Sequence, residues 1–389
     1  MNHIYLDNAA ATPLDPEVKH AMEPYEREYF GNPSSIHKKG QEAKRAVDAA
    51  RKSIAQVLGS RPDEILFTSG ATEADNLAVQ GIARKYDKGH ILTTPIEHRA
   101  ILSICEHLLQ EGRSVAYIPA DQYGIVDVHG IVEMVKPETV LISINYANNE
   151  IGTIEPIADI ARSIKKIRQK RVQQKNSTPL FFHTDASQAA EFLDIHAEKL
   201  GIDLMTLNAA KIYGPKGVGC LYMRRGVALE PILYGGGQER GLRSGTENVP
   251  GIVGFPKALE IAQKKKSSET VRLTELRDWF IKEIKKELPD AVLNGHPVYR
   301  LPNNIHISIP GIEGEALVLY LDAKGIYCST GSACTSVSLE PSHVLRALGK
   351  PDEYTTGSLR FTLGRGTTKK DLEYVLKVLQ EVVIKLQRS

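Results

Sequence analysis

The feature that most constrains the fold is the alternation of short apolar segments with longer amphipathic ones through residues 64–223. Segments rich in Ile, Leu, Val, Phe and Thr and bounded by turn residues predict strands over 64–69, 90–94, 114–118, 139–146, 180–185, 203–208 and 218–223. Between most of them, helical patterns cover 71–86, 99–111, 128–135 and 156–170. This order predicts an α/β fold with a mainly parallel seven-stranded sheet covered by helices on both faces.

The pattern changes after about Gly251. Two helical segments, 249–266 and 269–288, are joined through residues 264–268, which are Lys and Ser only. Further on, strands are predicted over 304–309, 326–329 and 358–363, and helices over 313–324 and 370–387. We therefore expect a large domain of residues 15–255 and a smaller α+β domain made of 1–14 and 256–389.

Composition and charge exclude several classes of protein. The 49 Lys and Arg against 47 Asp and Glu give a formal charge of +2, which argues against nucleic acid or an anionic membrane as the main partner. Four cysteines in 389 residues cannot form a disulfide framework and favour a reducing compartment. No apolar run is long enough to cross a membrane, and the first residues lack the features of a signal peptide. We expect a cytoplasmic enzyme.

Two chemically distinctive residues follow predicted strands. Lys211 comes just after the strand at 203–208 and before a Gly-Pro turn, where a lysine with a lowered pKa can form a Schiff base. Asp185 ends the strand at 180–185, and ligands of parallel sheets bind beyond such ends. A lysine and an acid are what pyridoxal 5'-phosphate (PLP) requires. An exposed lysine and a helix N-cap are the simpler interpretations.

The segment 68–76 passes from a strand through small residues into a helix that begins with hydroxyl and acidic side chains. Backbone N–H groups at such a helix start can bind a phosphate. The alternative is an ordinary helix capped by Ser69 or Thr72.

The segment 326–341 is rich in Ser, Thr, Gly and Ala and predicts a mobile loop. It carries Cys334, whose thiol we expect to be reactive, whereas Cys328 at the strand end is expected to be structural. No cysteine pair or histidine cluster has the spacing of a metal site, so no metal is expected.

Residues 162–175 carry seven basic side chains and no acidic one. A solvated helix face followed by a loop is the ordinary interpretation of such a run. The alternative is a surface for RNA or for an acidic partner.

Ten motifs in a fixed order carry a family resemblance that runs nearly from end to end. They are 5–10 (YLDNAA), 31–37 (GNPSSIH), 69–73 (SGATE), 97–98 (EH), 148–152 (NNEIG), 183–188 (HTDASQ), 211–217 (KIYGPKG), 243–248 (RSGTEN), 331–336 (GSACTS) and 360–365 (RFTLGR). In these motifs the chain resembles the cysteine desulfurases of the NifS/IscS type, in the class V aminotransferase group. The resemblance implies the fold of the fold-type I PLP-dependent transferases.

The resemblance also implies which residues are catalytic. Lys211 would hold PLP covalently and act as a base, His98 would stack on the pyridine ring, and Cys334 would accept the sulfur. Arg360 would bind the substrate carboxylate, a task that suits a guanidinium, and Asn149 would also contact the substrate.

The implied cofactor contacts surround the whole of PLP. Asp185 would pair with the ring nitrogen, and Gln188 and Asn149 would contact the phenolic oxygen. Residues 71–72 would bind the phosphate, together with Thr246 of the second subunit. The complete set is Ala71, Thr72, His98, Asn149, Asp185, Gln188, Asn208, Lys211 and Thr246.

One position departs from the family. The residues before the lysine are usually Ser-Gly/Ala-His, in which Ser and His help to bind the phosphate, but here 208–210 are Asn-Ala-Ala. Asn208 can still donate a hydrogen bond, whereas Ala210 cannot replace an imidazole. The departure bears on PLP affinity rather than on the type of reaction.

The implied function is that of a PLP-dependent cysteine desulfurase, a transferase that converts L-cysteine to L-alanine. The sulfur would be placed as a persulfide on Cys334 for an acceptor protein of iron–sulfur cluster assembly or tRNA thiolation. A homodimer is expected, without direct binding to nucleic acid or membrane. One alternative is another class V PLP enzyme, a selenocysteine lyase or an aminotransferase. Another is a non-catalytic PLP-fold binding platform.

Overall fold

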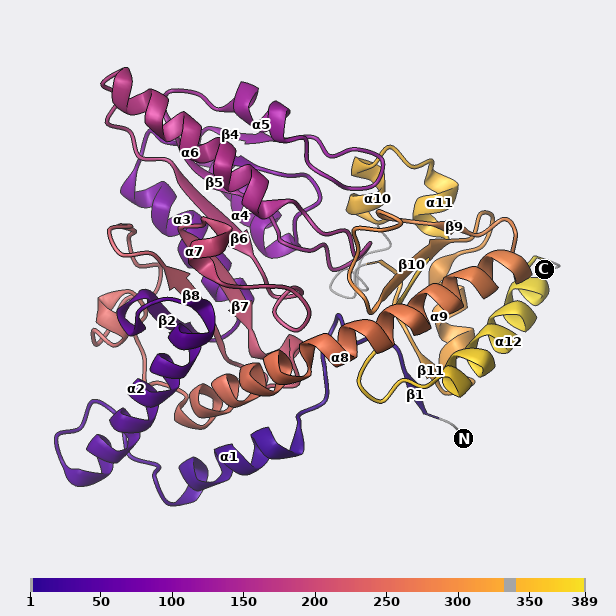
Figure 1. The fold of residues 1–389 in the computed structure, drawn as a ribbon, viewed down its shortest axis with the longest axis horizontal. Coiled ribbons are helices and arrows are strands. Elements are labelled where there is room, and N and C mark those ends of the chain that lie inside the picture. Colours follow the sequence, from indigo (N-terminus) through magenta and orange to yellow (C-terminus); the bar gives the residue numbers. More distant parts are fainter. Residues whose placement is uncertain (1–2, 332–340, 388–389) are drawn as a thin grey trace.

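The structure is a computed structural model that describes residues 3–331 and 341–387. A seven-stranded sheet with helices on both sides forms the larger part, and two smaller sheets form the rest (Figure 1). This arrangement confirms the predicted combination of an α/β part with a smaller α+β part.

All seven predicted strands form, and together they make one sheet in the order β2-β8-β7-β6-β5-β3-β4. Six strands run parallel, and β8 runs antiparallel to both of its neighbours. The strands are β2 (Ile65–Thr68), β3 (His90–Thr93), β4 (Val115–Tyr117), β5 (Thr139–Ser143), β6 (Phe181–Asp185), β7 (Leu204–Asn208) and β8 (Gly219–Met223). The carboxyl ends of β5, β6 and β7 therefore lie next to one another along one edge of the sheet.

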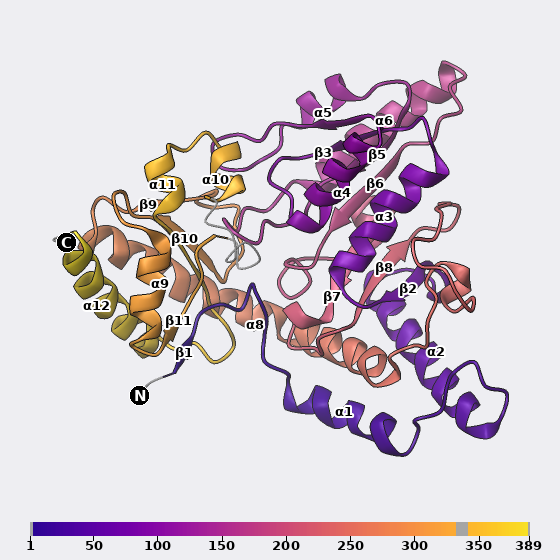
Figure 2. The same cartoon turned by 180° about the vertical axis from the view of Figure 1, so that it is seen from behind.

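The sheet separates two apolar cores, because successive side chains of a strand point to opposite faces. On β5, Ile142 belongs to one core and its neighbour Leu141 to the other. Helices α2 (Lys38–Leu58) and α6 (Ile157–Gln173) pack in the first core, and α3 (Ala71–Lys85) and α4 (Arg99–Gln110) pack in the second. Figure 2 shows α3 and α4 on the near face of the sheet, so the prediction of helices on both faces is confirmed.

The two helices predicted over 249–266 and 269–288 are wrong as separate elements. They form one helix, α8 (Val249–Glu287), of 39 residues. The Lys and Ser residues between the two segments include neither Gly nor Pro, so nothing in the backbone ends the helix there. Phe255 packs in the first core of the large sheet and Phe280 packs in the core of the smaller part. The helix therefore ties the two parts together.

The smaller part joins the two ends of the chain. Its sheets consist of β12 (Ser358–Thr362), β10 (Asn304–Ser308) and β9 (Val292–Leu293), and of β1 (Ile4–Tyr5) paired with β11 (Ile326–Tyr327). Helices α9 (Gly314–Asp322) and α12 (Lys369–Leu386) contribute to the same core. The pairing of β1 with β11 accords with the predicted grouping of 1–14 with 256–389, and the domain boundaries stay a prediction.

The remaining elements are shorter or lack a strong apolar stripe. They are α1 (Pro16–Arg27), α5 (Val128–Met134), α7 (Ala197–Leu200), α10 (His343–Ala347), α11 (Asp352–Thr356), and the 3₁₀ helices η1 (Pro62–Glu64), η2 (Ala209–Lys211) and η3 (Glu239–Gly241). Of these, only α5 is predicted from the residue pattern. In the part of the chain that the structure describes, no helix has both the length and the apolar character needed to cross a membrane.

Candidate active site

A cavity of about 210 Å³ lies beyond the carboxyl ends of the central strands. Asp185 ends β6 and Asn208 ends β7, and both line this cavity, as expected for a ligand site of a parallel sheet. The full lining is Ala9, Ala10, Ala71, Thr72, His98, Asn145, Ala147, Asn149, Asp185, Ser187, Gln188, Asn208, Lys211 and Arg360. Nine of the eleven residues singled out from the sequence are therefore brought together.

The amine of Lys211 is held inside the cavity by the N-terminal segment. Lys211 ends η2, directly after β7, and its Nζ donates to the carbonyl oxygens of Ala9 at 2.8 Å and Ala10 at 2.6 Å. Gln188 Nε2 donates to the same oxygen of Ala9 at 2.9 Å. Residues 9 and 10 thus form the wall against which the lysine rests.

Three acids lie near one another at this end of the sheet, and only Asp185 lines the cavity. Burial, reinforced by the charge of Asp185, raises the pKa of the fully buried Asp75 well above its usual range. Burial also raises the pKa of Glu97 to about 8, and Asp185 again adds to the shift. The Oδ1 of Asp185 accepts a hydrogen bond from Ser187 N at 2.9 Å, which fixes the carboxyl group at the end of β6.

His98 occupies the N-cap of α4, and this position fixes its ring. Its Nδ1 accepts a hydrogen bond from Ala100 N at 3.1 Å. Burial lowers the pKa of His98, and the charge of Lys211 acts in the same direction. A neutral imidazole whose Nδ1 is an acceptor carries its proton on Nε2. The ring is therefore an uncharged flat surface, which suits stacking on an aromatic cofactor.

The start of α3 has the properties of a phosphate site. Gly70 is its N-cap, and no side chain of the described residues caps the helix, so the first N–H groups are available to an anion. Gly70 has a φ of +155°, which glycine adopts readily. A Cβ on Gly219 of β8 would lie 2.8 Å from the carbonyl carbon of Gly70, so the close approach of strand and turn requires glycine at position 219.

Arg360 reaches the cavity from the smaller part of the molecule. It lies on β12, is only 1% exposed, and donates from Nη2 to Asp7 Oδ1 at 2.9 Å. Its Nη1 donates to the carbonyl oxygens of Asn149 at 3.1 Å and Gly331 at 2.9 Å. Its Nε has no partner among the described residues. A planar guanidinium held in this way can bind a carboxylate ligand.

The Asn-Ala-Ala sequence at 208–210, which departs from the usual Ser-Gly/Ala-His of the family, changes the local hydrogen bonds. Asn208 Oδ1 accepts a hydrogen bond from Ala210 N at 3.1 Å and so caps η2. The amide nitrogen of Asn208 is then the group that can donate to a phosphate. Ala210 is not among the residues that line the cavity, and its carbonyl oxygen accepts from Thr12 N and Thr12 Oγ1, each at 3.0 Å.

Two of the residues singled out from the sequence are not placed in the cavity. Thr246 is exposed and does not line it, and Cys334 lies outside the described residues. Cys328 is buried, and burial raises the pKa of its thiol, in accord with the structural role expected for it.

Three polar residues at the site are missed by the reasoning from the sequence. Ser187 lines the cavity, and its buried Oγ has no partner in the part of the chain described. Asn145 follows β5, so the rule that ligands lie beyond strand ends could have identified it. Asp7 has no such signal, because its contact with Arg360 joins residues 353 positions apart. The unpartnered Ser187 hydroxyl and the uncapped start of α3 fit a polar, phosphorylated cofactor.

Comparisons with known proteins identify the family of the chain. The family model "Aminotransferase class-V" matches residues 4–375. The chain is 48% identical over 386 residues to cysteine desulfurase IscS of Dictyoglomus turgidum, which covers 99% of this chain and 95% of the relative. It is 49% identical over 386 residues to cysteine desulfurase IscS of Methanosarcina thermophila, with 99% and 93% covered. A solved NifS-like protein has a TM-score of 0.91 at 38% identity and covers 99% of this chain and 100% of that chain.

These similarities extend over both parts of the molecule and not over the large sheet alone. The overall architecture, with its large sheet and smaller part, is therefore similar to that of the solved NifS-like protein. The chain belongs to the class-V aminotransferase family and, within it, to the cysteine desulfurases.

Proposed function

We propose that the cavity binds PLP and L-cysteine and that the protein removes the sulfur of L-cysteine and releases L-alanine. The observation that carries this proposal is the convergence of nine predicted site residues, from positions as distant as 71 and 360, on one cavity. An amine, a carboxyl group, an uncapped helix start and a guanidinium meet there. This combination is what a PLP enzyme acting on an amino acid requires.

The cavity residues suit PLP group by group. The N–H groups at residues 71–72 and the amide of Asn208 would hold the phosphate. Asp185 would keep the ring nitrogen protonated, and Gln188 and Asn149 would contact the phenolic oxygen. When bound, PLP withdraws electrons from the substrate Cα and makes the Cα proton acidic.

The remaining groups would act on the substrate. Lys211 would hold the cofactor and, once displaced by the substrate, would move the Cα proton with its Nζ. The carbonyl oxygens of Ala9 and Ala10 that accept from Nζ would keep the displaced amine inside the cavity. His98 would stack on the ring as a neutral imidazole, and Arg360 would bind the substrate carboxylate, with Asn149 beside it.

Sulfur transfer is assigned to Cys334 by the motif that contains it. Its thiolate would attack the sulfur of the substrate, so that an S–S bond forms as the C–S bond breaks. The electron pair of the broken bond stays with the carbon fragment, which takes up a proton and leaves as alanine. The persulfide would then pass its outer sulfur to an acceptor protein of iron–sulfur cluster assembly or tRNA thiolation.

We assign this reaction to a homodimer in the cytoplasm. Thr246 is exposed and lies outside the cavity of its own chain. In the proposed dimer it would reach the phosphate bound by the partner subunit. Mixed dimers of Lys211→Ala and Thr246→Ala chains should then recover activity that neither variant has alone. A fully active monomer in sedimentation experiments would contradict the shared site.

The activity is tested with purified protein, PLP, L-cysteine and dithiothreitol. The reaction should form alanine and sulfide in equal amounts. Lys211→Ala should form neither, whereas the control Lys216→Ala should remain active, because Lys216 does not line the cavity. Cys334→Ser should still bind PLP and change its absorption with L-cysteine, but it should form no persulfide. Alanine production by Lys211→Ala at the wild-type rate would overturn the proposal.

A further inference from the structure

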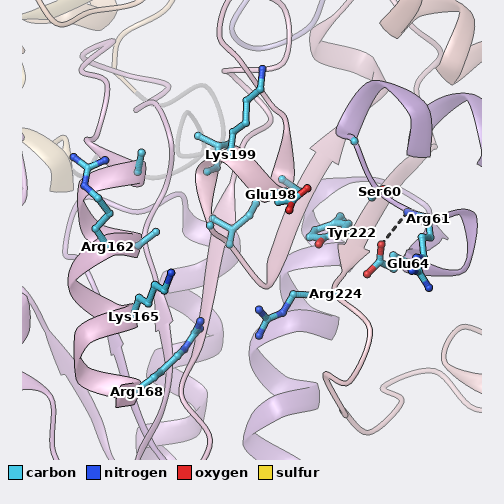
Figure 3. Close-up of a pocket in the computed structure, with 17 residues that line it drawn as sticks. Ser60, Arg61, Glu64, Arg162, Lys165, Arg168, Glu198, Lys199, Tyr222 and Arg224 are labelled. Carbon is cyan, nitrogen blue, oxygen red and sulfur yellow. Dashed lines mark hydrogen bonds between the residues drawn. The ribbon is translucent and has the colours of Figure 1, made fainter. Parts of the chain in front are cut away.

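A second hollow, of about 800 Å³, lies at the opposite end of the seven-stranded sheet (Figure 3). Strand β8 runs from the active-site end of the sheet to the end that carries this hollow. Its first residue, Gly219, pairs with Asn208 beside the active-site cavity, whereas its last residue, Met223, pairs with Leu204 at the other end. Arg224 follows Met223 and lines the hollow together with residues of α6, α7 and the loop after α2.

The hollow contains a pair of arginines that share one carboxylate. Arg168 of α6 and Arg224 both form ion pairs with Asp203, and the Arg224 Nη2 lies 2.6 Å from Asp203 Oδ1. Asp203 is fully buried, and its Oδ2 also accepts from Phe182 N at 2.8 Å, so it cannot move toward the solvent. One fixed carboxylate therefore holds two guanidinium groups, which leaves one positive charge in excess.

Lys165 adds a further charge at the same place. It lies one turn before Arg168 on α6, and no ion pair or hydrogen bond joins its amine to another of the described residues. Figure 3 shows Lys165 and Arg168 extending from α6 toward Arg224, which points back at them. The three cations and Asp203 together carry an excess of two positive charges.

The other charged side chains around the hollow leave this excess at the α6 end. Arg61 and Glu64, of opposite charge, both lie beyond Tyr222 on the side away from α6 (Figure 3). Arg162 is paired with Asp159, and Lys199 lies 3.4 Å from Asp194. Glu198 lies nearer to Tyr222 than to the α6 side of the hollow (Figure 3). A negative ligand would therefore be bound between α6 and Arg224 and repelled from the α7 side.

We propose that this hollow binds a small molecule that carries a diphosphate or triphosphate group. Guanidinium forks match the geometry of phosphate oxygens, and a lysine adds a mobile donor. The volume falls in the range of small-molecule sites, and Ala158, Ala161 and Leu200 give an apolar wall for the rest of the ligand. This site accounts for part of the basic run at 162–175.

The proposal is tested by calorimetric titration of the PLP-loaded enzyme with pyrophosphate and with ADP. Because PLP then occupies the phosphate position of the active site, the binding of pyrophosphate or ADP that is measured comes from the second hollow. Saturable binding is expected, weaker at higher salt. Lys165→Gln should weaken it about tenfold, the loss expected for one charge-assisted contact. The control Lys166→Gln removes the same charge from the next residue, which lines a different hollow, and should leave binding within about twofold.

A second variant tests the repulsive side of the site. Glu198→Gln removes a negative charge from the hollow and should tighten pyrophosphate binding severalfold, an outcome that misfolding cannot mimic. Equal effects of Lys165→Gln and Lys166→Gln, or no saturable binding of either ligand at millimolar concentration, would overturn the proposal. Binding of an RNA hairpin with which neither small phosphate competes would overturn it in favour of a nucleic-acid surface. None of these outcomes depends on desulfurase activity.

Discussion

The two sides of the active-site cavity are built in different ways. On the side of the large sheet, Asp185 and Asn208 stand at strand ends and bond to N–H groups only two residues further along the chain. On the side of the smaller part, Arg360 is positioned by residues 7, 149 and 331, which are distant in sequence. Local geometry thus fixes Asp185 and Asn208, whereas contacts that are distant in sequence fix Arg360. The contacts of Lys211 and Gln188 with residues 9 and 10 complete the cofactor side. Substitutions on the two sides should therefore change different kinetic quantities.

The largest effect is expected on the cofactor side, from Asp185→Asn. The variant keeps the shape of the side chain but loses the charge proposed to keep the ring nitrogen protonated. We expect kcat to fall by roughly 10²- to 10⁴-fold, the range for loss of a group that controls a proton. The absorption spectrum should show that PLP is still bound. A normal kcat would break the assignment of Asp185.

On the substrate side, Arg360→Gln should act on substrate binding. The loss of a charge-assisted contact of about 1.5–3 kcal/mol corresponds to roughly a 10- to 100-fold rise in KM. Binding of PLP should change little, because Arg360 reaches the cavity from β12 and not from the sheet that holds the cofactor residues. Steady-state kinetics and a PLP titration separate the two quantities. Loss of PLP with an unchanged KM would reverse the proposed division.

Glu97, on the cofactor side, should make the stability of the protein depend on pH. Its pKa is raised from 4.5 to about 8, so between these values the folded protein holds a proton that the unfolded chain releases. The free energy of unfolding should therefore fall as the pH rises from 5 to 8, by at most about 1.4 kcal/mol per pH unit from this group. Urea unfolding of Glu97→Gln should show a flatter dependence. An equal slope in both proteins would contradict the raised pKa.

A smaller effect, on PLP affinity, is expected from a substitution at Asn208, where the sequence departs from the family pattern. Asn208→Ala removes the amide proposed to donate to the phosphate and should weaken PLP binding by about tenfold. The dissociation constant follows from fluorescence titration of the apoenzyme. An unchanged constant would show that the N–H groups at residues 71–72 hold the phosphate alone.

The smallest effect is expected from Asp7→Asn. The amide oxygen can still accept from Arg360 Nη2, but the negative charge that competes with the substrate carboxylate is lost. We expect KM for L-cysteine to fall a few-fold, since the hydrogen bond is kept and hydrogen bonds to charged and to neutral groups differ by about 1 kcal/mol. A rise in KM would show that Asp7 positions Arg360 more than it competes with the substrate.

The same division explains how much could be predicted from the sequence. The seven strands and the residues at their ends were predictable, because apolar segments and turn residues are local signals. The continuity of α8 was not, because polar residues at 264–268 resemble a linker although they permit a helix. The pair formed by Asp7 and Arg360 has no local pattern at all, and only the folded chain brings it together.

The central claim is that Lys211 carries the cofactor in this cavity. The most direct measurement is borohydride reduction of the PLP-loaded protein, followed by peptide mapping with mass spectrometry. The account predicts one pyridoxyl adduct, on the peptide that contains Lys211, and no adduct in Lys211→Ala. A reduced adduct on any other lysine of the wild-type protein, with Lys211 unmodified, would contradict it.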